Sequence, residues 1–188
     1  MARIGKRRAV VLGALLAAVV LVGAGLYWFQ PWKLWTDETV NEPLPSATVQ
    51  PLAPTASLPP GATQAPSAPE GPRTLAQGEL ISHEHTTTGT VKIVQLPDGS
   101  RTLRLENLDT SNGPDLQVWL TDAPVKEGVA GWRVFDDGKY VRLGRLKGNK
   151  GDQNYPIPAA VQLADYTSVS IWCDRFDVSF GAANLRRN

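Results

Sequence analysis

The single cysteine of the chain, Cys173, is the side chain that bears most directly on chemistry. A thiol can exchange disulfides with a partner, but one cysteine cannot form an internal disulfide. Strand alternation places Cys173 on the same face as Val169 and Ile171, which predicts a buried thiol. Arg175 follows two residues later and favours a position at the rim, where it would lower the thiol pKa and stabilise the thiolate. The residues alone leave both interpretations open.

The only two histidines, His83 and His85, are two residues apart. On a strand both rings would project to one face, a spacing that suits ligation of a metal or haem iron, whereas a surface strand edge would hold at least one of them without function. No Cys-x-x-Cys-His motif occurs, and the only methionine is Met1, which excludes a methionine ligand in the domain. The sequence predicts no cofactor and no metal site, with haem or a metal held through His85 as the alternative.

The stretch Asn112-Gly-Pro-Asp115 is typical of a turn, because Asn and Gly accept positive φ and Pro fixes the next φ. Asp115 could instead accept backbone N–H groups or belong to a cation site.

No motif of a hydrolytic centre is present, neither Gly-x-Ser-x-Gly, nor His-Glu-x-x-His, nor a pair of catalytic carboxylates. The formal net charge is +1, and no basic stripe with interleaved aromatic residues occurs. We therefore expect neither a self-contained enzyme nor a nucleic-acid-binding protein.

Short runs with period-two alternation begin at Thr74 and predict strands separated by Gly and Pro turns. The apolar residues of these runs are Val91 and Ile93; Leu103 and Leu105; Leu116, Val118 and Leu120; Val141 and Leu143; Val169, Ile171 and Cys173; and Val178, Phe180 and Ala182. Asp98-Gly99 predicts a hairpin, and residues 159–166 suit one short helical turn. The fold class is all-β, a single antiparallel β-sandwich or jelly-roll-like domain.

The N-terminal segment combines basic residues with a long apolar run. Arg3, Lys6, Arg7 and Arg8 precede eighteen uncharged residues, 9–26, and aromatic residues occupy 27–29. This predicts a transmembrane helix over 9–29, a cytoplasmic tail over 1–8 and an extracytoplasmic remainder, so that membrane lipid is one partner and the cell membrane the location. A cleaved signal peptide is the alternative, because Gly23-Ala-Gly25 offers small residues.

Nine prolines between residues 36 and 73 lie amid Ala, Ser, Thr and Gln. Such a composition buries too little apolar surface to offset its ordering entropy, which predicts a disordered, semi-extended linker over 36–73. The motifs Pro51-Leu-Ala-Pro54 and Pro66-Ser-Ala-Pro69 leave a ligand for a polyproline-binding partner as the alternative.

Four ordered blocks between Thr74 and Leu185 resemble the DM-thirteen domain, an extracytoplasmic module with a proposed electron-transfer role. The blocks are His85 with Gly89, residues 96–105, residues 110–120, and residues 146–183 with their cysteine. The resemblance implies a redox thiol at Cys173, with His85, Asp115 and Arg175 as tuning neighbours. It also implies a structured loop over 147–154 that packs Tyr155 and brings Asp152 near the functional end, where Asn112 is also expected.

These observations predict a single-pass membrane protein whose exported β domain has a redox role through Cys173 and acts on an unknown envelope partner. The alternative is an envelope binding or scaffold domain whose cysteine is inert core.

Overall fold

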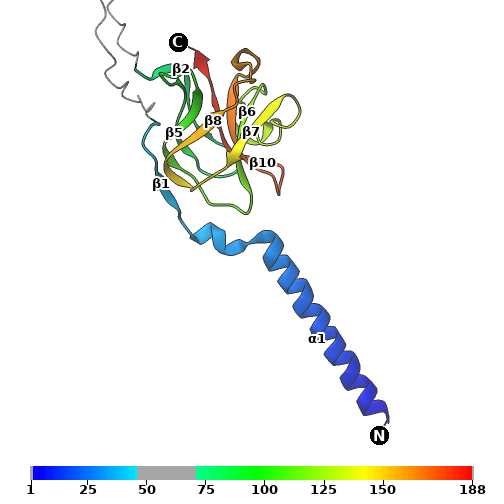
Figure 1. Ribbon diagram of the computed structural model, residues 1–188. Helices are drawn as coiled ribbons and strands as arrows, with labels where there is room; N and C mark the ends of the chain where they lie inside the picture. The colour runs from blue at the N-terminus through cyan, green and yellow to red at the C-terminus, as the bar shows by residue number, and fades with distance from the viewer. Residues whose placement is uncertain (1, 46–70, 188) are drawn as a thin grey trace, which may run out of the picture.

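The computed structural model describes residues 2–45 and 71–187. It begins with one long helix, α1 (Ala2–Phe29), which projects away from the rest of the chain, followed by the 3-10 turn η1 (Pro31–Trp35) (Figure 1). The stretch Val10–Lys33 has a mean hydropathy of 2.5 and is long enough to cross a bilayer. This segment is a candidate membrane span, as the sequence predicted.

The remaining strands form two sheets that enclose one core, which confirms the predicted β-sandwich. The six-stranded sheet has the order β1 (Thr39–Asn41), β8 (Lys150–Ile157), β5 (Arg101–Asp109), β4 (Thr88–Gln95), β2 (Arg73–Glu79), β11 (Arg186–Arg187). The five-stranded sheet has the order β3 (Ile81–Ser82), β10 (Val178–Asn184), β9 (Ser168–Cys173), β6 (Leu116–Thr121), β7 (Tyr140–Arg145). Every pairing among these strands is antiparallel except β1 with β8.

The hairpin predicted at Asp98-Gly99 joins β4 to β5. Gly99 has φ 82°, and Asp98 closes the turn by accepting hydrogen bonds from the N–H and hydroxyl of Ser100 at 2.9 and 2.6 Å. The side-chain period of the flanking strands then pairs Val91 with Leu105 and Ile93 with Leu103 on the inner face.

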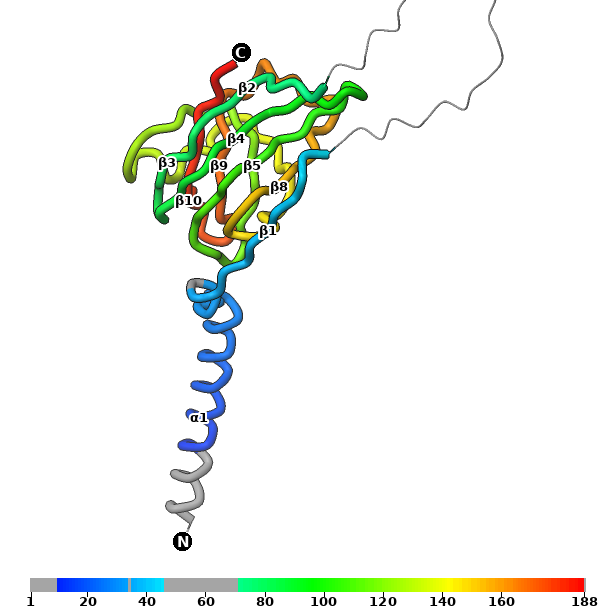
Figure 2. Tube along the Cα trace, turned by 90° about the vertical axis from the view of Figure 1, so that its left-hand side faces the viewer, coloured from blue at the N-terminus to red at the C-terminus, as the bar shows by residue number. Residues whose placement is uncertain are grey.

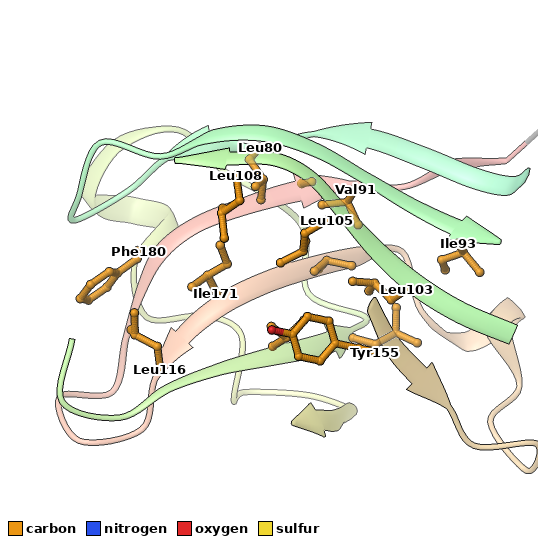
Figure 3. Packing of buried hydrophobic residues seen from close by; sticks show 14 of the residues in the cluster. Leu80, Val91, Ile93, Leu103, Leu105, Leu108, Leu116, Tyr155, Ile171 and Phe180 are labelled. Atoms are coloured by element: carbon orange, nitrogen blue, oxygen red, sulfur yellow. The ribbon is translucent and has the colours of Figure 1, made fainter. Parts of the chain in front are cut away.

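The core lies between the inner faces of the two sheets (Figure 3). Leu103, Leu105 and Tyr155 enter it from the six-stranded sheet, while Ile171 and Phe180 enter from the other. The predicted alternation is confirmed for these strands, since the residues between them point outward.

In β10 the alternation breaks. A bulge between Ser179 and Gly181 shifts the register against β9, so Phe180 stays in the core and Ala182 turns to the outer face. The prediction that Ala182 shares a face with Val178 is therefore wrong, and Ala183 takes the inward position.

The outer face of the five-stranded sheet is also covered. Trp119 and Trp172 point outward from β6 and β9, and Phe135 packs on them from the long β6–β7 connection, which contains η2 (Gly128–Gly131). This explains why every residue of β9 is buried. Residues 159–166 hold the short turn η3 (Leu163–Asp165), as predicted.

The segment predicted as a loop over 147–154 is in large part the strand β8. Its run of Gly and amide residues hid the alternation, because the inward side chain opposite Leu105 is the polar Gln153. Gln153 is fully buried and accepts hydrogen bonds from Tyr155 Oη (2.7 Å) and from the N–H groups of Lys147 (3.1 Å) and Gly148 (3.3 Å). Its own Nε2 donates to Gly148 O at 2.7 Å.

The predicted linker begins too early. Residues 39–41 form β1, which runs parallel to β8 at the edge of the six-stranded sheet (Figure 2). Gly151 makes room for it: its φ is 92°, and a Cβ at this position would clash with Val40 O. Arg73 already belongs to β2. The rest of the predicted linker, residues 46–70, lies outside the described residues.

Candidate functional site

Cys173 is the last residue of β9, and its side chain points into the core. Its exposed fraction is 0%, and the thiol is free. Its strand neighbours are Leu116 of β6 and Val178 of β10. Strand alternation thus predicted its face correctly, and the thiol is not exposed at the rim.

The groups around the thiol shift its pKa in opposite directions. Burial raises the pKa of Cys173 above its ordinary value, and the negative charge of Asp115 adds to this rise. The backbone N–H groups of Arg175, Phe176 and Asp115 near the sulfur lower the pKa and so act in the other direction. Because the pKa is raised on balance, the closed site holds a neutral thiol.

Two short segments therefore surround the sulfur, the turn Asp174–Asp177 between β9 and β10 and the loop that precedes β6. They are joined by a hydrogen bond from Asp174 N to Asp115 O at 3.0 Å, and Phe176 N donates to Cys173 O at 3.3 Å. Asp177 ends the turn with φ 49°. Displacing this four-residue turn would open one side of the thiol.

The guanidinium of Arg175 does not stabilise the thiolate as the sequence predicted. Its Nη1 donates to Tyr27 O at 3.3 Å and to Trp28 O at 2.6 Å, at the end of α1. Of the groups of Arg175, the backbone N–H lowers the thiol pKa, and the guanidinium does not. The prediction failed because the partner of the guanidinium is a segment almost 150 residues away in the sequence.

Asn112 and Asp115 lie beside the thiol end, in the loop where the turn was predicted. The Asp115 carboxylate accepts from Arg145 Nη2 at 2.8 Å and Gln117 Nε2 at 2.9 Å, so it is neutralised by an arginine. Asn112 Oδ1 accepts from Gly113 N at 2.8 Å, and its Nδ2 donates to Thr36 O at 3.3 Å. These contacts favour a structural role over a cation site.

The two histidines point to different surroundings, so the expectation of two rings on one face is wrong. β3 ends at Ser82, and strand alternation does not extend to them. The His85 ring is partly exposed and lies 4.0 Å from the Phe180 ring, whereas the buried His83 ring stacks on Phe135 at 5.7 Å. His83 Nδ1 also lies 2.8 Å from Ser179 Oγ, and its Nε2 lies 3.1 Å from Lys126 O.

Neither histidine belongs to a metal cluster in the described part of the chain, where no three His, Cys, Asp or Glu side chains come together as a metal site. A cavity of about 70 Å³ beside the thiol end is lined by Lys33, Asn112, Asp115 and Arg145, among others. That volume suits a few water molecules and is far below what haem requires.

Asp152 lies on β8, and its hydrogen bonds do not reach the loops around Cys173. Its carboxylate accepts from Arg104 Nη2 at 2.8 Å and from Asn107 N at 2.9 Å, and Arg104 also binds Glu106. This ion-pair network stabilises the outer face of the six-stranded sheet. The expected place of Asp152 at the functional end rested on a loop that is in fact a strand.

Sequence reasoning also missed an aromatic ladder on the outer face of the five-stranded sheet. The Tyr140 and Trp119 rings stack at 4.2 Å, and the Trp119 and Trp172 rings at 5.0 Å. The guanidinium of Arg142 lies 5.1 Å from the centre of the Trp119 ring and pairs with Asp174 of the turn at 2.8 Å. The signal was present, because tryptophans at outward positions of two strands indicate that this face is covered.

Comparison with protein-family models matches residues 79–185 to the model described as Electron transfer DM13. The chain belongs to the DM13 family. The comparisons with curated proteins and with solved structures gave no significant match. The DM13 match contains β3 to β10, with Cys173 and the turn that follows it, while α1, β1 and most of β2 precede it.

The pH dependence of stability should report the two histidines of this DM13 domain. Burial lowers the pKa of His83 and of His85 below 6.5, so the unfolded chain binds protons more readily than the folded one. Stability is therefore full above about pH 6.5 and falls below it, by at most about 1.4 kcal/mol per pH unit for each histidine. Urea unfolding between pH 7 and 5.5 measures the slope.

The control is the double variant His83→Gln with His85→Gln, which removes both histidines of the chain. Its stability should be nearly flat over the same pH range. An equal slope in this variant would show that other groups cause the pH dependence.

Proposed function

We propose that this chain is a membrane-anchored, extracytoplasmic electron-transfer module in which Cys173 is the redox group. Membership in the DM13 family supports the redox role, and the basic residues before the candidate span support a cytoplasmic N-terminus with the domain outside. Thiol–disulfide exchange moves two electrons without a bound cofactor.

The proposal rests on how the buried thiol is covered by the short turn between β9 and β10. The turn Asp174–Asp177 follows Cys173 directly, and its N–H groups at Arg175 and Phe176 would stabilise a thiolate once burial is relieved. The closed state protects the thiol, and displacement of the turn activates it.

The reaction is exchange with a disulfide of an envelope partner. The Cys173 thiol loses its proton to solvent, and the thiolate attacks one partner sulfur. A Cys173–partner disulfide forms, and the second partner sulfur leaves as a thiolate. A second thiol from outside this chain then attacks the Cys173 sulfur. The Cys173–partner bond breaks, the partner is released as a dithiol, and Cys173 and the second thiol share the new disulfide.

The second candidate function is a binding or scaffold module at the envelope. The complete burial of Cys173 and its raised pKa favour this alternative, because a neutral thiol in the core is inert. The two functions differ in one property, the free energy required to expose the thiol.

Thiol exchange at rising urea concentration separates the two. The full chain in detergent is treated with a small aromatic disulfide, and the opening free energy of Cys173 is compared with the free energy of global unfolding. A redox thiol should open locally, several kcal/mol below global unfolding and with little urea dependence. Cys173→Ala controls for reagent consumed elsewhere.

A loosened turn gives the matched comparison. Phe176→Ala removes a ring that packs on the core from the turn and should accelerate exchange about tenfold, whereas Val129→Ala, at an exposed site, should not. Exchange that occurs only through global unfolding in all three chains would refute the redox proposal and leave the scaffold module.

A further inference from the structure

The end of α1 is completed by the β domain. A helix leaves its last four carbonyl groups without partners, and cations near its C-terminus stabilise them. The last turn of α1 contains no basic residue. Arg175 supplies the missing cation from the β9–β10 turn through its two hydrogen bonds to Tyr27 O and Trp28 O.

Aromatic contacts reinforce this junction. The Arg175 guanidinium lies 5.0 Å from the centre of the Trp28 ring, and the Phe29 and Phe176 rings stack at 5.8 Å. Tyr and Trp at the end of a span occupy the lipid–water interface, since one side of each ring is apolar and the other polar. The β9–β10 turn therefore contacts the span at the depth of this interface.

The spacer after the span is short and fixed along the same end of the domain. Lys33 Nζ donates to Gly113 O at 3.2 Å, and Glu38 N donates to Asn149 Oδ1 at 2.7 Å. β1 then enters the sheet at Thr39. Because only nine residues, 30–38, separate α1 from β1, the domain cannot move far from the bilayer.

The charges at this end suit phosphate headgroups. Arg175 and Lys33 are joined there by Arg133, whose Nη1 donates to Phe176 O at 3.1 Å and Asp177 O at 3.2 Å. Arg142 and Arg145 pair with Asp174 and Asp115 and remain largely exposed, with exposed side-chain fractions of 53% and 73%. These five cations lie near four carboxylates, those of Glu38, Asp115, Asp174 and Asp177.

We propose that the β9–β10 turn and these basic side chains form a bilayer-docking surface. The turn lies in the headgroup layer, with Phe176 at the boundary of the acyl chains and the arginines against lipid phosphates. The occupant is the lipid surface itself. The inference depends on α1 spanning the membrane. It concerns the same turn that covers Cys173, but it requires no reaction of the thiol.

A site-specific label tests the depth of the turn. In the full chain with Cys173→Ala, the variant Asp177→Cys places an environment-sensitive fluorophore on the turn, and Ser100→Cys places it on the β4–β5 hairpin. This hairpin lies at the far end of the domain from α1 (Figure 2). The vesicles contain phosphatidylcholine and phosphatidylglycerol, with a quencher attached at headgroup level or dissolved in the water.

The label at 177 should lose about half its emission to the lipid quencher, and the label at 100 almost none. Arg175→Ala should reduce the quenching at 177 severalfold, because the turn loses its tie to α1, whereas Arg187→Ala at the exposed C-terminal strand should not. Should Asp177→Cys fail to fold, Arg145→Cys reports on the same end. Equal access of the aqueous quencher to both labels would overturn the proposal, whatever the result of thiol exchange.

Discussion

Phe180→Ala should lower the free energy of unfolding by about 3–5 kcal/mol. The ring is 2% exposed, lies in the core and contacts the His85 ring, so truncation leaves a cavity beneath the partly exposed histidine. The bulge in β10 fixes its position, and a closely packed core relaxes only partly around a truncated side chain. Urea unfolding of the full chain at constant pH measures the loss.

Val129→Ala is the control, because Val129 is 74% exposed on η2. It should change stability by less than about 0.5 kcal/mol. A loss below about 1 kcal/mol for Phe180→Ala would show that the ring contributes little to the core.

Gln153→Leu should be about as damaging, with a loss of about 3–5 kcal/mol, although leucine is apolar and of similar size. Both the oxygen and the nitrogen of the Gln153 amide are hydrogen-bonded. Its removal leaves the Tyr155 hydroxyl proton and the N–H and C=O of Gly148 without these partners, while Lys147 N keeps Tyr155 Oη as its acceptor at 3.1 Å. Each buried polar group left unsatisfied costs about 1–3 kcal/mol, and solvation of the loop recovers part of the sum.

Gln162→Leu provides the matched control, since the same substitution occurs at an exposed position. Thermal unfolding of both variants should show a large fall in Tm for Gln153→Leu only. If both variants unfold like the parent chain, the hydrogen bonds of Gln153 are not a source of stability.

Much of the sandwich could be predicted because its signals are local. Asp98-Gly99 has the chemistry of a tight turn, and Val91, Ile93, Leu103 and Leu105 alternate on both sides of it. The face of Cys173 followed from the same alternation. These features depend on turn residues and on the two-residue period of a strand, both of which can be recognised in the sequence.

The errors arise where a distant segment decides the structure. β8 was not predicted because its inward position holds a glutamine that is satisfied by a loop, and β1 was hidden in a proline-rich region because its partner is more than 100 residues away. Arg175 had the right chemistry for a thiolate, yet the end of α1 competes for its guanidinium. None of these partners can be found from residue spacing.

The edge strands also determine how the domain can be isolated as a soluble fragment. The family match begins at Glu79, the last residue of β2, so a fragment cut there loses β1 and nearly all of β2. Both β8 and β4 would then expose a row of unpaired backbone groups, which invites pairing with other chains and aggregation. A fragment that begins at Thr36 and retains the chain between β1 and β2 keeps β8 paired with β1 and β4 paired with β2. The soluble folding unit is therefore larger than the unit that sequence similarity delimits.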